Sequence, residues 1–383
     1  MKFGVPELED LPDVSGRRVL VRCDFNVPMT AGVIDDDLRI RAALPTLKWL
    51  GDHGATVTAC SHLGRPNGVA NPKYAMDAVR SRLSELVPNV SLLDNLRFNP
   101  GEEANDPEFV SELVKAQDLY VDDAFGAAHR AHASIVGPPR SLPSAAGRLL
   151  AREVEVLGGL LEKPRKPFIA VLGGSKVSDK LQVISALLDR CDQLLIGGGM
   201  CFTFLAAMGH SIGASLFEAE MVETCKELLA KANGKIVLPS DISALSPDGG
   251  FGAEASKRSG EVRQCGRSLP DGWRGLDIGP GAAAEFADLL LDARTIFWNG
   301  PMGVFEDDRF AGGTRAVAQA MADTKAFTIV GGGDSAAALA KFRLDDEVDH
   351  VSTGGGASLE YLEHGDLPGL EALRGAAKRM GLS

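Results

Sequence analysis

Short apolar runs alternate with amphipathic segments along almost the whole chain. The runs are rich in Val, Ile, Leu and Phe and show little polar alternation, which is typical of strands buried on both faces of a parallel sheet. We therefore predict an α/β protein in which helices cover parallel sheets. The predicted strands are residues 18–21, 56–60, 119–121, 168–172, 193–196, 235–238, 295–298, 327–330 and the short run 350–352.

Amphipathic segments lie between these runs. In residues 40–50 the apolar positions recur at the spacing of one helical face. Residues 147–161 form a longer predicted helix, and the charged hexapeptide 162–167 that follows holds two prolines. Prolines stop a helix and suit a domain junction. We therefore place an N-terminal domain at residues 1–163 and expect a loop or irregular hairpin at residues 246–275.

Composition narrows the class of protein. The length of 383 residues allows two or three domains, and 45% apolar with 24% charged residues is ordinary for a globular chain. A net charge of −12 argues against broad affinity for nucleic acids or anionic membranes. The six cysteines are scattered without a C-x-x-C pair, so we expect free thiols in a reducing, cytoplasmic compartment. We also expect no secretory signal and no membrane span, because the longest uncharged apolar run, residues 194–209, is short and holds three adjacent glycines.

Basic residues follow the predicted strands of the first half. In parallel α/β sheets, ligands bind where strands end and loops lead into helices. Arginine forks bind phosphate and carboxylate oxygens in a bidentate manner, so basic residues gathered at one sheet edge would form a cationic pocket. Asp24 and Asn26 could accept hydrogen bonds from a ligand hydroxyl at the same edge. The basic residues are Arg39, His62, Arg65, Arg97 and Arg130.

Each of these residues also has an ordinary explanation. A single arginine is commonly part of a surface ion pair, and His62, His129 or His132 could cap a helix or pack in the core. Their joint placement after separate strands favours a binding site.

Glycine-rich loops follow the predicted strands of the second half. Glycine lets backbone N–H groups approach oxyanions closely, and a following helix N-terminus adds a partial positive charge. Lys176 and Lys180 would share a helix face if their segment is helical, and either could neutralise a phosphoryl group. Asp334 is a candidate Mg²⁺ ligand, because Mg²⁺ often takes one carboxylate plus phosphate oxygens. The loops are residues 173–180, 197–199, 299–306, 331–335 and 353–358.

Two other interpretations stay open at this point. Gly331-x-Gly333-x-x-Ala336 fits a loose dinucleotide pattern with Asp349 at the expected distance, which would suit a nicotinamide-dependent dehydrogenase. That interpretation leaves the arginines and the other glycine loops unexplained. A non-catalytic scaffold that binds phosphates is the second alternative. No P-loop motif occurs, and a single glycine triplet is explained equally well by a tight turn.

Taken together, the motifs closely resemble those of the phosphoglycerate kinase family. They appear in family order and span nearly the whole chain. Asp94, Asp122 and Ser240 depart from the family pattern, which usually has Glu, Asn and Val there, without touching the charges that the chemistry needs. The matching segments are residues 21–28, 61–66, 123–130, 173–180, 197–199, 298–306, 331–335 and 352–357.

The resemblance implies two Rossmann-like domains, each a parallel β-sheet flanked by helices, joined by a hinge helix. It implies an acid-substrate domain at 1–163, a nucleotide-binding domain at 164–367 and a tail, 368–383, that packs back on the first domain. The implied protein is a monomeric glycolytic kinase. Its reaction would be ATP + 3-phosphoglycerate ⇌ ADP + 1,3-bisphosphoglycerate, with Mg²⁺ bound to the nucleotide. The nucleophile in either direction is already anionic, so no general base is needed.

The resemblance also implies residue roles. The acid-substrate site would comprise Asp24, Phe25, Asn26, Arg39, His62, Leu63, Gly64, Arg65, Arg97 and Arg130. The nucleotide site would comprise Gly173, Gly174, Lys176, Lys180, Gly198, Asn299, Glu306, Gly332, Gly333, Asp334 and Ser335, with Glu306 on the ribose and Asp334 on Mg²⁺. The transferring phosphoryl group would be stabilised by Arg39, Lys176, Lys180 and the backbone N–H groups of Gly354, Gly355 and Gly356.

Overall fold

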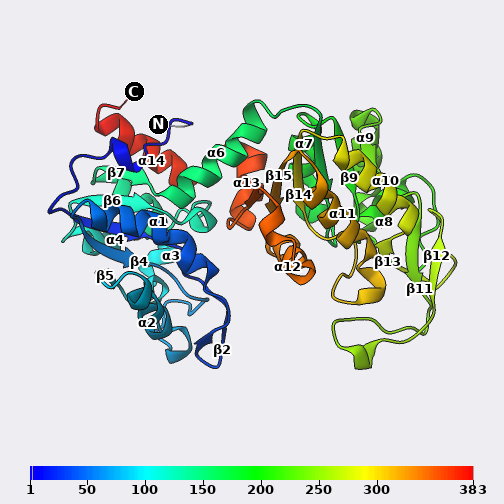
Figure 1. Cartoon of the computed structure of the whole chain (residues 1–383), viewed down its shortest axis with the longest axis horizontal. Helices are drawn as coiled ribbons and strands as arrows, with labels where there is room; N and C mark the ends of the chain where they lie inside the picture. Colours follow the sequence, from blue (N-terminus) through cyan, green and yellow to red (C-terminus); the bar gives the residue numbers. More distant parts are fainter. Residues whose placement is uncertain (2, 383) are drawn as a thin grey trace. The chain divides into compact units, whose positions relative to one another are not determined.

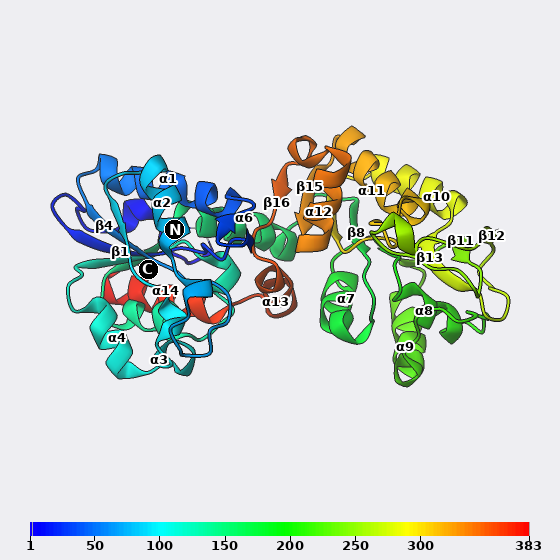
Figure 2. The ribbon, with the colours of Figure 1, turned by 90° about the horizontal axis from the view of Figure 1, so that it is seen from below.

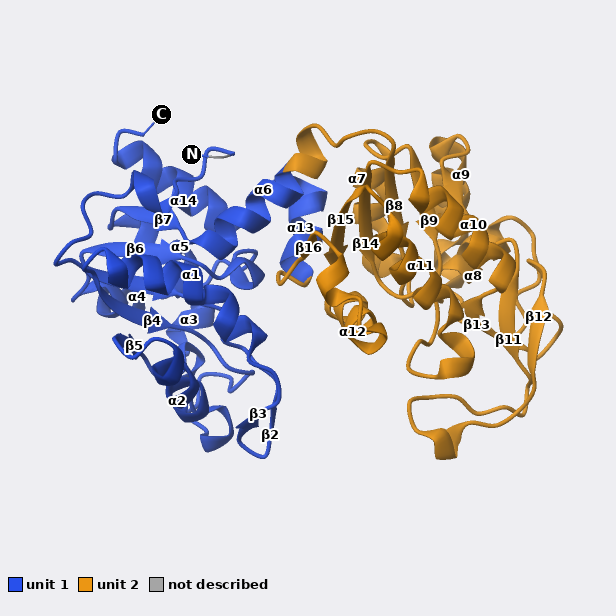
Figure 3. Ribbon diagram, in the orientation of Figure 1, with its two compact units in different colours: residues 1–158, 356–383 blue, residues 159–355 orange. Residues whose placement is uncertain are grey.

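The computed structural model describes Met1 and residues 3–382, which form two compact units (Figure 3). Unit 1 comprises residues 1–158 and 356–383, and unit 2 comprises residues 159–355. The first division lies inside helix α6 (Arg148–Glu162), a few residues before the prolines at which the sequence placed a domain boundary. Helix α13 (Gly356–His364) groups with unit 1, although the sequence placed it in the C-terminal domain.

Unit 1 is built on a five-stranded parallel sheet with the order β5-β4-β1-β6-β7. Its apolar core includes Val19 and Val21 of β1 and Ala59 of β4, all without solvent exposure. A short antiparallel hairpin of β2 (Met29–Thr30) and β3 (Val33–Ile34) lies outside the sheet. The sheet strands are β1 (Arg18–Arg22), β4 (Thr56–Cys60), β5 (Val90–Leu92), β6 (Leu119–Asp122) and β7 (Ser144–Ala146).

Helices cover both faces of this sheet. Figure 2 shows α1 and α2 on one face, and α4 and α14 on the other. The C-terminal helix α14 packs against α5 and β7, with Leu370 and Leu373 fully buried. Besides α6 and α13, the α-helices of unit 1 are α1 (Leu38–Asp52), α2 (Asp77–Leu86), α3 (Gly101–Ala104), α4 (Pro107–Val114), α5 (Ala133–Val136) and α14 (Pro368–Arg379).

Unit 2 is built on a six-stranded parallel sheet with the order β10-β9-β8-β14-β15-β16. Every residue of β8 and β14 is buried, which explains why these strands read as unbroken apolar runs in the sequence. The strands are β8 (Phe168–Leu172), β9 (Gln193–Ile196), β10 (Ile236–Val237), β14 (Thr295–Asn299), β15 (Phe327–Gly331) and β16 (His350–Val351). The prediction of helix-covered parallel sheets is confirmed.

Helices α10 and α11 pack together on one face of the unit 2 sheet, and α7 and α9 lie on the other (Figures 1 and 2). The predicted irregular hairpin is an antiparallel sheet of β11 (Ile242–Leu245), β12 (Val262–Cys265) and β13 (Arg274–Ile278), joined by a long loop. The helices are α7 (Leu181–Leu188), α8 (Cys201–Ala207), α9 (Val222–Ala232), α10 (Pro280–Leu291), α11 (Gly312–Asp323) and α12 (Gly333–Phe342). Within the described residues, no helix has both the length and the apolar character to cross a membrane.

Candidate active site

In unit 1 the loops that follow β1 and β4 are tied to each other. The backbone N–H of Phe25 donates to Ser61 Oγ at 2.8 Å, and the N–H of Gly64 donates to Asn26 Oδ1 at 2.8 Å. Parallel strands end at the same sheet edge, so these bonds hold the two predicted substrate-binding segments side by side. Phe25, Asn26 and Gly64 therefore lie together.

The 3₁₀ helix η3 (Leu96–Phe98) adds Arg97 to this edge. Arg97 Nη1 donates to the carbonyl oxygen of Gly64 at 2.8 Å. The Asn95 amide holds the backbone of Leu63 from both sides, accepting from its N–H at 3.2 Å and donating to its carbonyl at 2.7 Å. Asn95 was not among the predicted site residues, yet it fixes the segment that carries two of them.

Arg39, in the first turn of α1, forms an ion pair with Asp24. Burial acts to raise the pKa of the Asp24 carboxyl, but the positive charges of Arg39 and its neighbours outweigh it and hold that pKa below its usual value. Asp24 is therefore ionised, and Arg39 keeps a half-exposed guanidinium beside it. The pair can present both a hydrogen-bond acceptor and a cation to a small acid.

His62 lies beside a buried arginine that the sequence analysis did not single out. Arg22 Nη2 is 3.2 Å from His62 Nδ1, and Arg22 Nε donates to Ser134 Oγ at 2.8 Å. Ser134 in turn donates to the buried carboxylate of Glu102 at 2.6 Å. Burial, reinforced by the charge of Arg22, lowers the pKa of His62 to about 3, so the imidazole is neutral.

Arg65 and Arg130 are exposed residues at the ends of their loops. Burial and the nearby charges of Arg22 and Arg130 lower the pKa of Arg97, which indicates that these guanidinium groups approach one another. Like charges gather in this way when an anion is to be bound between them. The structure thus brings most of the predicted acid-site residues to one edge of the unit 1 sheet.

In unit 2, Lys180 joins three of the glycine-rich segments. Its Nζ donates to Gly173 O at 2.6 Å, to Asn299 O at 3.1 Å and to Asn299 Oδ1 at 2.6 Å. The Asn299 amide donates onward to Gly331 O at 2.8 Å. Burial lowers the pKa of Lys180 to about 8, while the nearby carboxylate of Asp334 opposes the shift. A partly buried ammonium at this junction can act as a counter-charge for phosphate.

The same loops surround a cavity of about 660 Å³ within unit 2. Gly174, Gly198, Glu306 and Asp334, all predicted nucleotide-site residues, line it. Gly198 has φ +65°, and a Cβ there would lie 2.6 Å from the backbone of Gly174. Only glycine allows the two loops to approach this closely. Phe202, Leu216, Phe217 and Phe251 supply an apolar wall.

Lys176 and Lys180 would share a helix face only if their segment were helical, and that condition is not met. Residues 173–177 are not helical, and Lys180 ends the short 3₁₀ helix η6 (Ser178–Lys180) before α7 begins. Glu218 accepts hydrogen bonds from the backbone N–H groups of Val177 and Ser178, at the start of this short helix. Lys176 is exposed beside the loop, whereas Lys180 is partly buried and bonded to the loop backbone.

Helix α12 begins at the glycine-rich turn after β15. Gly332 precedes it with φ +89°, Asp334 lies in the first turn, and Ser335 Oγ accepts from Gly300 N at 2.6 Å. Among the described residues no group of three His, Cys, Asp or Glu side chains could hold a metal ion. Asp334 lines the cavity described above. A single carboxylate is the protein donor that Mg²⁺ uses when phosphate oxygens and water complete its shell, so Asp334 fits that role.

The structure also describes Glu306 and the glycines before α13, which the sequence predicted as site residues. Glu306 is exposed at the end of the loop after β14. Gly354 N donates to Ser352 Oγ at 3.2 Å, Gly355 has φ +53°, and Gly356 opens α13. A helix N-terminus after a glycine turn presents free backbone N–H groups.

Asp349 does not serve the loop after β15, as a dinucleotide site would require. Its carboxylate accepts from Thr328 N at 2.8 Å and from Thr328 Oγ1 at 3.1 Å. Thr328 lies near the start of β15, whereas the glycines follow its end. The dehydrogenase interpretation therefore loses the acidic residue on which it depended.

Comparisons by family model, by sequence and by structure all match this chain to phosphoglycerate kinases. A family model described as phosphoglycerate kinase matches residues 8–92 and 87–365. A phosphoglycerate kinase of Salinispora tropica is 53% identical, with 96% of this chain and 98% of that protein covered. One from Rubrobacter xylanophilus is 49% identical over 94% of this chain and 96% of that protein. The solved phosphoglycerate kinase of Coxiella burnetii is similar with a TM-score of 0.89 and 39% identity, covering 96% of this chain and 98% of that one.

Proposed function

Because this chain belongs to the phosphoglycerate kinase family, we infer that it catalyses the reversible transfer of a phosphoryl group between ATP and the carboxylate of 3-phosphoglycerate. The products are ADP and 1,3-bisphosphoglycerate. The observation that best supports this function is the junction at Lys180, where a partly buried cation and Asn299 together join three glycine loops beside the cavity lined by Asp334.

We assign the acid substrate to the cationic edge of unit 1. Arg39, Arg65, Arg97 and Arg130 would bind its phosphate and carboxylate oxygens, and neutral His62 would donate one hydrogen bond. Asp24, paired with Arg39, would accept from the substrate hydroxyl. Asn26 and the segment of residues 63–64 shape the edge through the contacts already described.

We assign the nucleotide to the cavity of unit 2. Its phosphates would lie against Gly173, Gly174 and Lys180, with the first turn of α12 at their far side, and Glu306 would bind the ribose hydroxyls. The apolar wall suits a base. Asp334 would hold Mg²⁺, which neutralises phosphate charge when it is bound.

The chemistry needs alignment and counter-charge rather than proton transfer. The attacking oxygen is anionic in both directions, so no general base is required, and the loose transition state is stabilised by positive charge. We assign this to Arg39, Lys176, Lys180 and the N–H groups of Gly354, Gly355 and Gly356. In-line transfer requires the attacking oxygen of one substrate and the leaving oxygen of the other to lie on opposite sides of the same phosphorus. The hinge movement expected around α6 is therefore part of this proposal.

We also expect a cytoplasmic monomer. The six cysteines are free, and five of them are buried, which agrees with the reducing compartment expected from the sequence. Sedimentation of the purified protein would test the monomer.

Turnover of 3-phosphoglycerate with MgATP, followed by coupled oxidation of NADH, tests the function. Activity that depends on both substrates and on Mg²⁺ is the expected result. Absence of turnover in a folded preparation would refute it. A titration with NADH alone should show no saturable change in fluorescence, because Asp349 is engaged elsewhere.

A further inference from the structure

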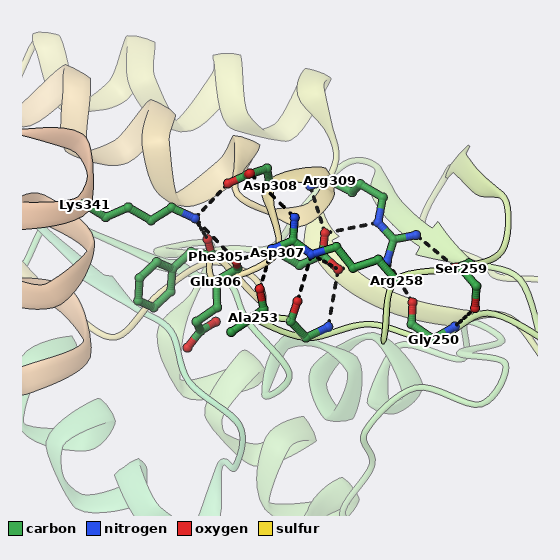
Figure 4. Close-up of polar contacts among 11 residues, drawn as sticks. Gly250, Ala253, Arg258, Ser259, Phe305, Glu306, Asp307, Asp308, Arg309 and Lys341 are labelled. Carbon is green, nitrogen blue, oxygen red and sulfur yellow. Dashed lines mark hydrogen bonds and ion pairs between the residues drawn. The ribbon is translucent and has the colours of Figure 1, made fainter. Parts of the chain in front are cut away.

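Two arginines grip a buried aspartate directly after the proposed ribose residue Glu306. The Asp307 side chain has no solvent exposure. Arg309 binds its carboxylate with two bonds, Nη2 to Oδ2 at 2.8 Å and Nε to Oδ1 at 3.1 Å. Arg258, from the loop between β11 and β12, lies with Nε 3.6 Å from Asp307 Oδ2. Figure 4 shows the three side chains converging.

The same arginines hold the backbone on both sides of Phe251. Arg309 donates to Gly250 O at 2.8 Å, and Arg258 donates to Gly252 O at 3.0 Å. Gly252 also donates its N–H to Asp307 Oδ2 at 3.4 Å. Phe251 itself has no such bond, and its ring lines the unit 2 cavity. The backbone that carries this ring is thus held by contacts made one residue to either side of it, and the Arg274 guanidinium lies over the ring itself, 5.4 Å from its centroid.

The segment that carries Glu306 is fixed by the same groups. Arg258 Nη2 donates to Glu306 O at 3.0 Å. Lys341 of α12 donates to Phe305 O at 2.7 Å and to Asp308 Oδ1 at 2.8 Å (Figure 4). The Glu306 carboxylate is left to face the cavity, since its backbone alone is engaged.

Arg258, Asp307 and Arg309 do not line the cavity, whereas Phe251 and Glu306, whose backbone segments they hold, both line it. Resting on the function proposed above, we propose that Arg258, Asp307 and Arg309 are positioning residues for the nucleoside part of the nucleotide. They hold Phe251 against the base and Glu306 at the ribose, and they leave the phosphate loops untouched. A hydrogen-bonded, buried arginine–carboxylate cluster is stiff enough for this, because its planar forks fix direction as well as distance.

The test is Asp307→Asn, which keeps the size of the side chain and removes its charge. The dissociation constant for ADP should rise about tenfold, since charge-assisted bonds that hold the site are lost. Binding of Mg²⁺-tripolyphosphate, which has no base or ribose, should change by less than about twofold. In kinetics the KM for MgATP should rise while kcat stays within about twofold, the pattern of lost uniform binding.

Asp118→Asn is the matched control. Asp118 binds Arg18 through two side-chain bonds of 3.1 and 2.8 Å, but the pair belongs to unit 1, whereas the proposed nucleotide cavity belongs to unit 2. This variant should leave the affinity for ADP unchanged. If the loss of an Arg–Asp pair acted only through stability, the melting temperature would fall in both variants. The affinities for ADP and for tripolyphosphate would then change by the same factor.

The proposal is overturned if Asp307→Asn binds ADP as tightly as the unmodified protein, or weakens ADP and tripolyphosphate equally. If circular dichroism shows that Asp307→Asn does not fold, Arg258→Gln decides instead, because Arg258 is partly exposed and still contacts both Gly252 O and Glu306 O. It should weaken ADP about threefold or more, and unchanged affinity would overturn the proposal. Failure of the unmodified protein to bind ADP would refute the proposed function itself, a different result.

Discussion

Arg22 and His62 share a buried contact of 3.2 Å between Nη2 and Nδ1. Arginine has donors only, so Nδ1 of His62 must accept and the ring proton must be on Nε2. Arg22 is held in turn by Ser134 and by the carbonyl oxygen of Cys23. The contact therefore fixes both the tautomer and the direction of the imidazole, and leaves Nε2–H as the free donor.

This contact predicts that His62 does not titrate near neutrality. A pKa of about 3 keeps the ring neutral throughout the physiological range. Long-range ¹H–¹⁵N spectra should show the Nε2–H tautomer unchanged from about pH 5 to about pH 8. His53, an exposed histidine, provides the comparison in the same spectra. A His62 midpoint near the ordinary histidine value would contradict the assignment.

Arg22→Lys tests whether the arginine does the positioning. Lysine keeps the charge but lacks the planar fork, so the bonds to Ser134 and His62 cannot both form. We expect mixed tautomers in the spectra and a fall in kcat/KM for 3-phosphoglycerate of about tenfold. Retention of a single Nε2–H tautomer would show that another group directs the ring.

Asp122→Asn should stabilise the protein at neutral pH. Asp122 is fully buried, and its Oδ2 has no hydrogen-bond partner. Burial raises the pKa of this carboxyl to about 7, so the folded state binds a proton that the unfolded state has released. The cost of charging the group therefore grows as pH rises from about 4 to about 7, and is complete above that.

The variant avoids this cost. We expect a gain of about 1–3 kcal/mol in the free energy of unfolding near pH 8, and little gain near pH 4. Urea unfolding of both proteins at the two pH values measures the difference. A gain that is larger at low pH would contradict the sign.

The sequence predicts the central strands of both sheets well and the edge strands of unit 1 poorly. The observed β8 matches its predicted range, because residues buried on both faces leave an unbroken apolar run. By contrast, β5 and β7 have three residues each, and β7 is Ser-Ala-Ala. Nothing in so short a run marks a strand. Their places are set by pairing with β4 and β6.

The candidate site likewise contains residues that the sequence predicts and residues that it does not. Residues that follow strands, such as His62 and Lys180, can be found from their place in the sequence, because parallel strands end at one edge. Their supporting partners cannot. Ser134 lies 112 residues from Arg22, and Arg309 lies 59 residues from Gly250. Only tertiary packing brings such pairs together, although an arginine inside an apolar strand is a signal that a buried acceptor must exist.

Lys180 predicts an alkaline limit on nucleotide binding. Its pKa of about 8 means that the charge that would face the phosphates is lost above that pH in the free protein. Affinity for ADP should therefore fall as pH rises through about 8, and a bound anion should shift the midpoint upward. Calorimetric titration across this range measures both effects. Lys180→Arg should bind ADP without this midpoint, since arginine stays charged.

Arg39→Ala should separate catalysis from nucleotide binding. Arg39 is the cation paired with Asp24, and both lie in unit 1, whereas the proposed nucleotide cavity lies in unit 2. Loss of the guanidinium removes a charge that we assign to the transition state and leaves Asp24 to repel an acidic substrate. We expect kcat to fall about 10²–10³-fold while the KM for MgATP stays within about threefold.

Arg41→Ala is the control for this prediction, because Arg41 lies on the same helix and its ion pair with Asp37, at 2.8 Å, is exposed. Its loss should cost at most about 1 kcal/mol of stability and leave kcat unchanged. Steady-state kinetics with each substrate varied in turn distinguishes the cases. If Arg39→Ala weakened nucleotide binding as much as it lowered kcat, Arg39 could not belong to a separate acid site. The division of the two substrates between the two units would then be wrong.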